Sequence, residues 1–590
     1  MAARAFARVA PVRAKVSLVI VLLLAALLTF RLGTVQIRDG PKLAREALEQ
    51  HDETVESLAK RGAILDRNGG VLVRSLPSES IFAVPQEVVD PHATAVKLAP
   101  ILGKPVDRLE PALRDRAQFR WLARKVSHGV AERVERLALP GIQTKAEDTG
   151  RRFIASGRLA STLLGFTDTD EHGIDGLEYA LDRTLRGTPG RMRIEADQFG
   201  RAIPLGETQV VQRATAGDDV VTTIDPYLQF EAERLLRGAM AKWSARSASA
   251  IVMDPWTGEL LAIANMPDYD PAHFAAFKPS SWRDGAVTDA YEPGSTFKLI
   301  TAAAAIESGR VAPDARFPAR DALEVGGRVI HNAEDGMMAG DLGGSESIEQ
   351  IVAYSHNVGA AEIGLATGPT AMYRMIRRFG FGGLTGVELP GESTGIVNPP
   401  SEWSGSTLPT ISFGHSISVT PIALIRAYAA IANGGVLVRP RIVSAVEDPN
   451  GKVIHRYGPA TQGRVMSVRT AAILRRFLRT VVVKGTGNPT ARVPGYTTAG
   501  KTGTAQVVGA GGYLAGAYVA SFIGMIPAER PRYVILVKVE RPRGSIYGSQ
   551  VAAPIFATLA REAMLHAEIM PAAPRAARLV PRRAAPKRSR

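Results

Sequence analysis

A long apolar run lies near the start of the chain, and the pattern becomes mixed after it. Residues 16–30 read VSLVIVLLLAALLTF, fifteen positions without a charge, and a basic segment precedes them. Such a run is either a cleavable signal peptide or an uncleaved membrane helix. Its end carries bulky side chains where a cleavage site needs small ones. We therefore expect an uncleaved anchor over residues 16–37, with Arg31 reaching to the outer interface. Positive charge on the N-terminal side predicts that residues 1–15 are cytoplasmic and the rest is outside.

Two regions of different character follow the apolar run. Residues 38–60 are polar and rich in helix-forming residues, which predicts a helical stalk. Residues 61–216 mix short strand and helix patterns with many glycines, and Asn68-Gly69 between apolar stretches predicts a hairpin. We find no phosphate loop, metal-ligand cluster or paired-carboxylate pattern in this second region.

The third region, residues 217–566, contains two groups of strand patterns. The first is a hairpin with Gly258 in its turn, and the second is three strands between about residues 496 and 540. Roughly two hundred mostly helical residues separate the groups. We therefore predict an α+β fold in which one antiparallel sheet is built from both groups and a helical block is inserted between them. Residues 567–590 are Pro/Ala/Arg-rich, which predicts a disordered basic tail.

Composition narrows the function classes. The chain has 590 residues, which favours two or three domains, and no cysteine, which excludes disulfides, thiolate metal sites and a cysteine nucleophile. Its net charge is +15. Four basic residues lie in residues 1–15 and seven in residues 571–590, so the body between them is only mildly basic. The high pI therefore does not indicate a nucleic-acid partner.

The stretch YEPGSTFK, residues 291–298, carries the first candidate chemistry. Ser295 and Lys298 lie three positions apart, so they share one face of a helix. The apolar run that follows predicts a buried helix, where a lysine tends toward the neutral form and becomes a general base for the serine. Ser-x-x-Lys alone is a weak signal, because it also occurs at Ser57 to Lys60.

Two further motifs strengthen this interpretation. Ser355-His356-Asn357 follows an amphipathic helical segment, and Lys501-Thr502-Gly503 lies in a predicted edge strand and continues as Thr504. We expect Gly503 to leave room where a substrate backbone approaches that strand.

In combination, Ser295-x-x-Lys298, Ser355-x-Asn357 and Lys501-Thr502-Gly503 resemble the three-motif signature of penicillin-binding proteins and serine β-lactamases. The resemblance extends beyond the motifs. Residues 61–69 and 173–190 resemble the pedestal of class B, monofunctional penicillin-binding proteins. Residues 411–435 and 499–506 are similar to the division-specific members, the penicillin-binding protein 3 type. The resemblance covers the anchor and about residues 61–562, and it does not include the basic tail.

The resemblance implies a peptidoglycan D,D-transpeptidase that acts at the septum. Ser295 would attack the D-Ala-D-Ala carbonyl of a stem peptide, and Lys298 would take its proton. Ser355 would relay a proton to the leaving D-alanine, Lys501 would shape the local field, and Asn357 would bind the substrate amide and orient Lys298. An amine of a neighbouring stem would then form the cross-link.

The resemblance also implies the binding groups. Thr502, Gly503 and Thr504 would hold the substrate, with the two threonines on its terminal carboxylate. The backbone N–H groups of Ser295 and Thr504 would form the oxyanion hole. A β-lactam antibiotic would acylate the same serine, no metal or cofactor is implied, and a membrane polymerase of lipid-linked disaccharide is the implied partner, with other division proteins.

Several alternatives stay open. An elongation-type transpeptidase, a D,D-carboxypeptidase or β-lactamase, a β-lactam sensor and a scaffold share parts of the pattern. A serine–histidine–aspartate triad is not excluded, although nothing places a histidine beside Ser295. We interpret His356 as loop structure, His415 as a packing residue or part of the cleft wall, and Tyr354 as structural. The basic tail could contact anionic wall polymers or lipid.

Overall fold

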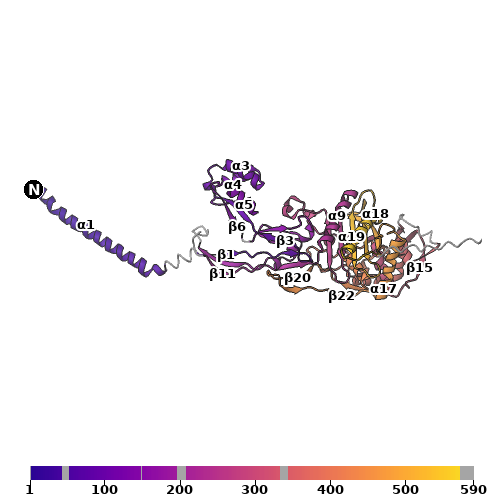
Figure 1. Cartoon of the computed structure of the whole chain (residues 1–590). Helices are drawn as coiled ribbons and strands as arrows, with labels where there is room; N and C mark the ends of the chain where they lie inside the picture. The colour runs from indigo at the N-terminus through magenta and orange to yellow at the C-terminus, as the bar shows by residue number, and fades with distance from the viewer. Residues whose placement is uncertain are drawn as a thin grey trace, which may run out of the picture. The chain divides into compact units, whose positions relative to one another are not determined.

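The computed structural model describes residues 2–42, 52–147, 149–195, 208–332, 343–509 and 511–571 (Figure 1). It forms two compact units. The first comprises Met1–Lys60 with Gly187–Ala216, and the second comprises Arg61–Arg186 with Gly217–Arg590.

The first unit contains the apolar helix. Helix α1 spans Ala2–Gly33 and continues as a π-helical turn, η1, over Thr34–Arg38. Within them, Ala14–Arg38 has a mean hydropathy of 2.4 and no buried side chain. At about 1.5 Å per residue, a helix of 25 residues is long enough to cross a bilayer. This agrees with a membrane anchor.

The same unit contains a three-stranded antiparallel sheet, in the order β1 (Asp52–Ser57), β10 (Gly190–Glu195) and β11 (Thr208–Gln212). The predicted helical stalk is therefore wrong over residues 52–57, and residues 43–51 lie outside the described residues. This segment is a strand because it pairs with a segment that is distant in the sequence. All of β1 pairs with β10, from Asp52 opposite Glu195 to Ser57 opposite Gly190, and local propensity does not reveal a partner so distant in the chain.

The second unit begins with the predicted hairpin. Strands β2 (Ile64–Leu65) and β3 (Val71–Leu76) flank Asn68-Gly69, and Gly69 has a φ of +84°. The Asp66 carboxylate accepts hydrogen bonds from the backbone N–H groups of Asn68 and Gly70, which closes the turn.

Two sheets organise the N-terminal part of this unit. A six-stranded sheet has the order β21-β20-β12-β2-β3-β7, and a three-stranded sheet has the order β5-β4-β6. Their remaining strands are β4 (Glu79–Ala83), β5 (Arg120–Val126), β6 (Ile142–Ala146), β7 (Arg151–Ile154), β12 (Asp219–Thr222), β20 (Val443–Glu447) and β21 (Val453–Arg456). Helices α3 (Pro91–Leu102), α4 (Val106–Leu113) and α5 (His128–Glu135) share a small core with the three-stranded sheet.

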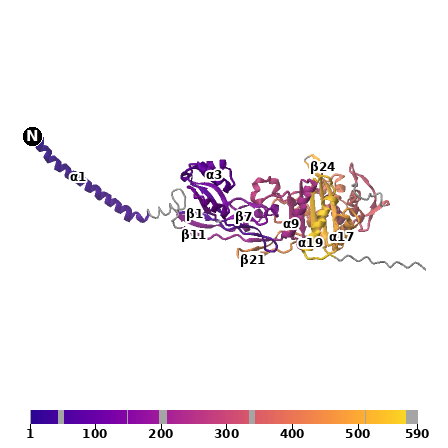
Figure 2. The same cartoon turned by 45° about the horizontal axis from the view of Figure 1, so that its top comes forward.

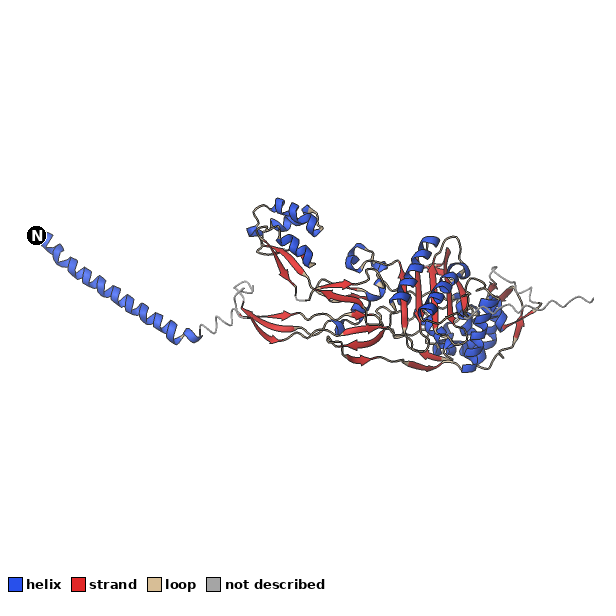
Figure 3. Cartoon of the chain, in the orientation of Figure 1, coloured by secondary structure: helices blue, strands red, loops and turns tan. Residues whose placement is uncertain are grey.

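A five-stranded sheet dominates the rest of the second unit, in the order β14-β13-β25-β24-β23. It combines β13 (Ser247–Met253) and β14 (Leu260–Met266) with β23 (Ala499–Gly509), β24 (Gly512–Ile526) and β25 (Tyr533–Glu540). The prediction of one antiparallel sheet built from two distant groups of strands is confirmed, and Figure 3 shows these strands side by side. Strand β23, which carries Lys501, forms one edge.

Helices cover both faces of this sheet. Strand side chains that alternate along β13 divide between two cores: Ala250 and Val252 pack with α9 (Pro226–Trp243) and α19 (Ala553–His566), whereas Ile251 and Met253 pack on the other side. The inserted block supplies that second side, with α11 (Lys298–Glu307), α12 (Ile348–Tyr354), α13 (Asn357–Thr367), α14 (Pro369–Arg378), α15 (Thr407–Ile411), α16 (Pro421–Ala432) and α17 (Val468–Val483). Figure 2 shows α9, α19 and α17 around β24.

Candidate active site

Ser295 lies in a short 3-10 turn, Gly294–Phe297, that leads directly into α11. The serine is half-buried, and Lys298 at the start of α11 is only 1% exposed. Gly294 has a φ of +55°, and a Cβ there would lie 3.0 Å from the Thr504 carbonyl oxygen. A glycine at this position therefore allows the Ser295 turn to lie against β23.

Lys298 connects the first motif to the second. Its Nζ donates to the Ser355 backbone carbonyl, lies 3.2 Å from Ser355 Oγ and donates to Asn357 Oδ1 at 2.8 Å. The side chain of a buried lysine is thus held by groups from a loop almost sixty residues further along the chain.

The backbone at Ser355 explains how its motif is presented. Ser355 ends α12 with a left-handed conformation, φ +65°, and α13 begins two residues later at Asn357. Asn332 stabilises this junction, because its Oδ1 accepts the backbone N–H groups of Asn357 and Val358 at 2.8 and 3.0 Å. Asn357 Nδ2 donates to the His331 carbonyl at 3.0 Å, which fixes the orientation of its amide.

Lys501 connects the third motif to the second. It is fully buried, and its Nζ donates to Ser355 Oγ at 2.9 Å and lies 3.2 Å from the carbonyl and the hydroxyl of Thr502. Thr502 Oγ1 also lies 2.8 Å from Thr486 Oγ1, and Thr504 Oγ1 accepts the Gly548 N–H at 3.3 Å. Ser355 Oγ is therefore shared by two lysines from opposite sides of the site.

The position of Gly503 differs from our expectation. A Cβ there would lie 2.4 Å from Ser521 Oγ and 3.0 Å from Thr296 Cγ2. Protein atoms, and not an open space for substrate, fill the volume that a side chain would need. The glycine allows the nucleophile turn to pack on the sheet.

The two histidines that the sequence singled out lie in different surroundings. His356 is buried, and its Nδ1 lies 2.5 Å from the Glu346 carboxylate, which is also buried. His415 Nδ1 lies 3.1 Å from the Tyr513 hydroxyl and 3.4 Å from Glu292 Oε2. Burial lowers the pKa of His415 to about 4. Burial also raises the pKa of Glu292.

Sequence reasoning missed four residues that contact the motifs or their neighbours. Glu292 could have been identified from the sequence, because it lies inside YEPGSTFK. Asn332, Glu346 and Tyr513 carry no sequence pattern of their own and act only through contacts made in the folded chain.

Family models match most of the chain. The model described as penicillin binding protein transpeptidase domain matches residues 248–561, and the one described as penicillin-binding protein dimerisation domain matches residues 56–222.

Several characterised proteins are similar over nearly the whole length. Stage V sporulation protein D of Bacillus subtilis is 35% identical, over 92% of this chain and 83% of that protein. Penicillin-binding protein PbpB of Mycobacterium tuberculosis is 33% identical over 92% and 83%, and peptidoglycan D,D-transpeptidase FtsI of Escherichia coli is 32% identical over 91% and 89%.

Solved structures give the same result. Penicillin binding protein 3 of Mycobacterium tuberculosis, complexed with aztreonam, is 31% identical over 88% of this chain and 98% of that one, with a TM-score of 0.67. Penicillin binding protein 2X of Streptococcus thermophilus is 28% identical over 88% and 81%, with a TM-score of 0.72. The chain belongs to the class B penicillin-binding proteins, which combine a dimerisation domain with a transpeptidase domain.

Proposed function

We propose that this chain is a peptidoglycan D,D-transpeptidase that cross-links stem peptides at the division septum through a serine acyl-enzyme. The observation that carries the proposal is the set of contacts from Lys298 through Ser355 to Lys501, which joins all three motifs in one site. The similarity to FtsI of Escherichia coli, named a peptidoglycan D,D-transpeptidase, supports both the activity and the division-specific assignment.

In the first step, Ser295 Oγ attacks the carbonyl carbon between the two D-alanines, and Lys298 accepts its proton. Lys298 must be neutral to do so. Its Nζ and that of Lys501 both approach Ser355 Oγ, so the two nitrogens lie within about 6 Å of each other. Burial of the Lys298 amine disfavours its charged form.

The tetrahedral intermediate then collapses. The C–N bond breaks, the terminal D-alanine takes a proton relayed by Ser355, and an ester to Ser295 remains. The backbone N–H groups of Ser295 and Thr504 stabilise the oxyanion. The close approach of Gly294 to the Thr504 carbonyl supports this assignment, because it brings both backbone segments together.

Binding of the donor uses the edge of β23. Thr502 and Thr504 hold the terminal carboxylate, and Asn357 binds the substrate amide while its oxygen orients Lys298. Gly503 contributes to binding through the backbone of the edge strand. In the second step the amine of a neighbouring stem attacks the ester, which releases Ser295 and forms the cross-link. A β-lactam forms the same ester and is released slowly.

We propose the following division of the chain: residues 1–15 cytoplasmic, 16–37 membrane anchor, 38–60 connecting segment, 61–216 pedestal, 217–566 transpeptidase domain and 567–590 basic tail. The apolar helix and the basic residues before it support a single-pass protein of the bacterial cytoplasmic membrane, with its catalytic domain on the outer side. We propose as partner a membrane polymerase of lipid-linked disaccharide, which the family resemblance implies.

The experiment is labelling of dividing cells with a fluorescent penicillin, comparing the natural chain with Ser295→Ala. Label at the septum that is lost in the variant supports the proposal. Filamentous cells on inhibition indicate the septal role, and round cells indicate the elongation-type alternative. Rapid hydrolysis of the β-lactam by purified protein would instead indicate a β-lactamase.

A further inference from the structure

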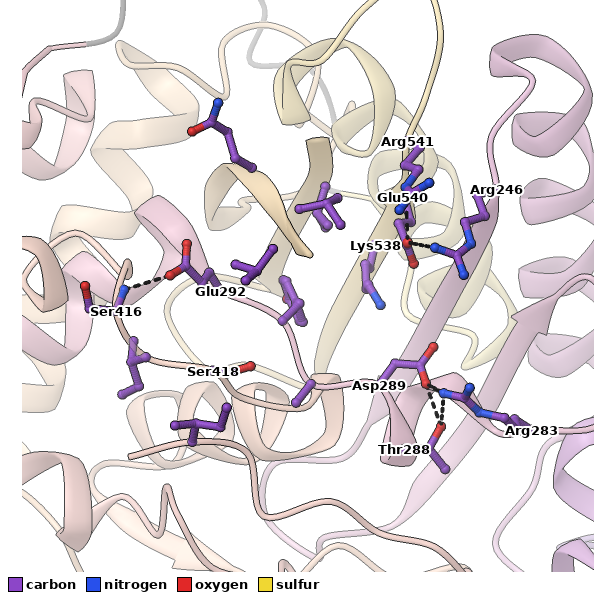
Figure 4. Close-up of a pocket in the computed structure, with 18 residues that line it drawn as sticks. Arg246, Arg283, Thr288, Asp289, Glu292, Ser416, Ser418, Lys538, Glu540 and Arg541 are labelled. Atoms are coloured by element: carbon purple, nitrogen blue, oxygen red, sulfur yellow. Dashed lines mark hydrogen bonds and ion pairs between the residues drawn. The ribbon is translucent and has the colours of Figure 1, made fainter. Parts of the chain in front are cut away.

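A cavity of about 680 Å³ lies in the transpeptidase region (Figure 4). The motif residues are not among those that line it. One wall consists of residues just before Ser295, from Thr288 to Glu292, and another consists of Gln506 to Val508 at the end of β23. Its volume is within the range of ordinary small-molecule and peptide-side-chain sites.

Lys538 is the unusual member of the lining. It lies on β25 and is only 3% exposed, yet in Figure 4 its side chain points toward the middle of the cavity. Within the described parts of the chain, no carboxylate lies within ion-pair distance of its Nζ and no hydrogen bond to it is formed. Its Nζ lies over the ring of Tyr291, 5.0 Å from the ring centre.

The other cations of the lining already have partners. Arg283 pairs with Asp289, and Arg246 lies 3.3 Å from Glu540, which also lies 3.8 Å from Arg541. The cavity therefore has four cationic and three acidic side chains, and Lys538 is the cation without an ion pair among the described residues. Burial lowers the pKa of Lys538, against the opposing influence of Glu540 and Asp289. A carboxylate entering the cavity would offset that cost of burial.

The sheet places Lys538 close to the chemistry. Gly503, Ser521 and Lys538 lie opposite one another on three successive strands, β23, β24 and β25. At about 4.8 Å between strands, the Lys538 Cα is roughly 10 Å from that of Gly503. Opposed residues point to the same face, and at Gly503 that face is the one on which Thr296 packs. Lys538 is therefore beneath the turn that carries the nucleophile.

The direction of β23 indicates which part of a donor peptide lies near the cavity. A peptide that pairs antiparallel with this edge strand has its C-terminal end at Lys501 to Thr504 and its preceding residues toward Gln506 to Val508. Those last positions line the cavity, together with aliphatic side chains that include Ile417 and Val519. Such a lining suits an aliphatic side chain whose end carries a carboxylate.

We propose that this cavity receives a carboxylate carried by the residue that precedes D-Ala-D-Ala in the donor stem peptide, with Lys538 as its counter-ion. The proposal rests on the transpeptidase function above and adds a specificity to it. Lys538 is a specificity-determining residue and takes no part in bond making. The donor would be a stem whose third residue is a diamino dicarboxylic acid, in preference to one with lysine there.

The test uses the full-length protein in detergent and two N-acetylated tripeptides that end in D-Ala-D-Ala. One begins with meso-2,6-diaminopimelate and the other with L-lysine, so they differ by one carboxylate. The release of D-alanine, with glycine as amine acceptor, gives kcat/KM for each donor. We expect a preference of about tenfold to a hundredfold for the dicarboxylic donor, as for a hydrogen bond to a charged group.

The variant Lys538→Met should reduce this preference to less than about twofold, while Lys538→Arg should retain most of it. Lys452→Met, a change of an exposed lysine, should leave it unaltered. Acylation by benzylpenicillin separates the proposed function from the proposed subsite. If the natural chain acylates normally but shows no donor preference, the subsite alone is overturned. If the natural chain does not acylate, the function is overturned. A preference that survives in an acylating Lys538→Met also overturns the subsite. If Lys538→Met does not acylate, the donor preference of the natural chain alone tests the subsite, and the absence of a preference overturns it.

Discussion

The Nζ of Lys501 donates a hydrogen bond to the hydroxyl of Ser355 at 2.9 Å, across 146 residues of sequence. Because Lys298 approaches the same hydroxyl at 3.2 Å, Ser355 is the meeting point of the two lysines. We propose that the two lysines have different roles: Lys298, which belongs to the turn of the nucleophile, is the base, and Lys501 shapes the electric field around it.

Replacement of the proposed base should remove most of the reactivity. We expect Lys298→Met to reduce the second-order rate constant of acylation by benzylpenicillin about 10²- to 10⁴-fold, the usual contribution of a positioned general base. Stopped-flow measurement of acylation checks this. The matched change Lys484→Met, at an exposed lysine, should leave the rate unaltered. A Lys298→Met protein that acylates at the natural rate contradicts the assignment.

Gly503 offers a test of packing between the nucleophile turn and the sheet. Gly503→Ala would place a Cβ 2.4 Å from Ser521 Oγ and 3.0 Å from Thr296 Cγ2, so the Ser521 side chain has to shift and the turn that carries Thr296 has to give way slightly. We expect a loss of about 1–3 kcal/mol in stability and about a 10- to 100-fold slower acylation.

Gly238→Ala is the control for that change. Gly238 lies inside α9, and a Cβ there would meet no atom within 4 Å. It should stabilise the protein by about 0.5–1 kcal/mol and leave acylation unaltered. Equal effects of the two substitutions would argue against the packing role of Gly503.

The buried pair of His356 and Glu346 should matter for stability and not for chemistry. His356→Ala leaves the Glu346 carboxylate buried without its partner at 2.5 Å, which should cost about 3 kcal/mol. The urea concentration that halves β-lactam labelling measures this loss. In the double variant with Glu346→Gln the buried carboxyl group is gone as well, so the loss should be smaller than the sum of the two single losses. Simple additivity would show that the pair is not coupled.

His415 should make the folded state sensitive to acid. Its pKa in the folded protein is about 4, below the ordinary value of 6.5, so between these pH values the unfolded chain binds the extra proton. Stability is therefore complete above pH 6.5 and falls as the pH decreases, by about 2 kcal/mol at pH 5 from this group. The raised pKa of Glu292 acts in the opposite direction, because stability from that group decreases as the pH rises through its folded pKa.

Comparison with His415→Gln isolates the histidine. Since Glu292 is present in both proteins, the variant should lose about 2 kcal/mol less than the natural chain between pH 7 and pH 5. Urea unfolding at the two pH values provides the measurement. Parallel losses in the two proteins would mean that His415 is not held neutral by the fold.

The sequence predicts features that depend on local pattern or on fixed motifs. The anchor helix, the Asn68-Gly69 hairpin and the two-part sheet follow from hydrophobic runs and turn residues. The strand at Asp52–Ser57 was not predictable in this way, because it exists only through its pairing with Gly190–Glu195. The sequence also does not show why position 503 is a glycine, since the atoms that exclude a side chain there come from Thr296 and Ser521. Lys538 has no motif at all, and only burial inside a cavity distinguishes it.

The most direct test of the account is covalent capture of radioactive benzylpenicillin by the full-length protein, followed by peptide mapping of the adduct. The account predicts one equivalent of label on Ser295, none in Ser295→Ala, and slow capture in Lys298→Met. Label on another hydroxyl, or undiminished capture by Ser295→Ala, would contradict it.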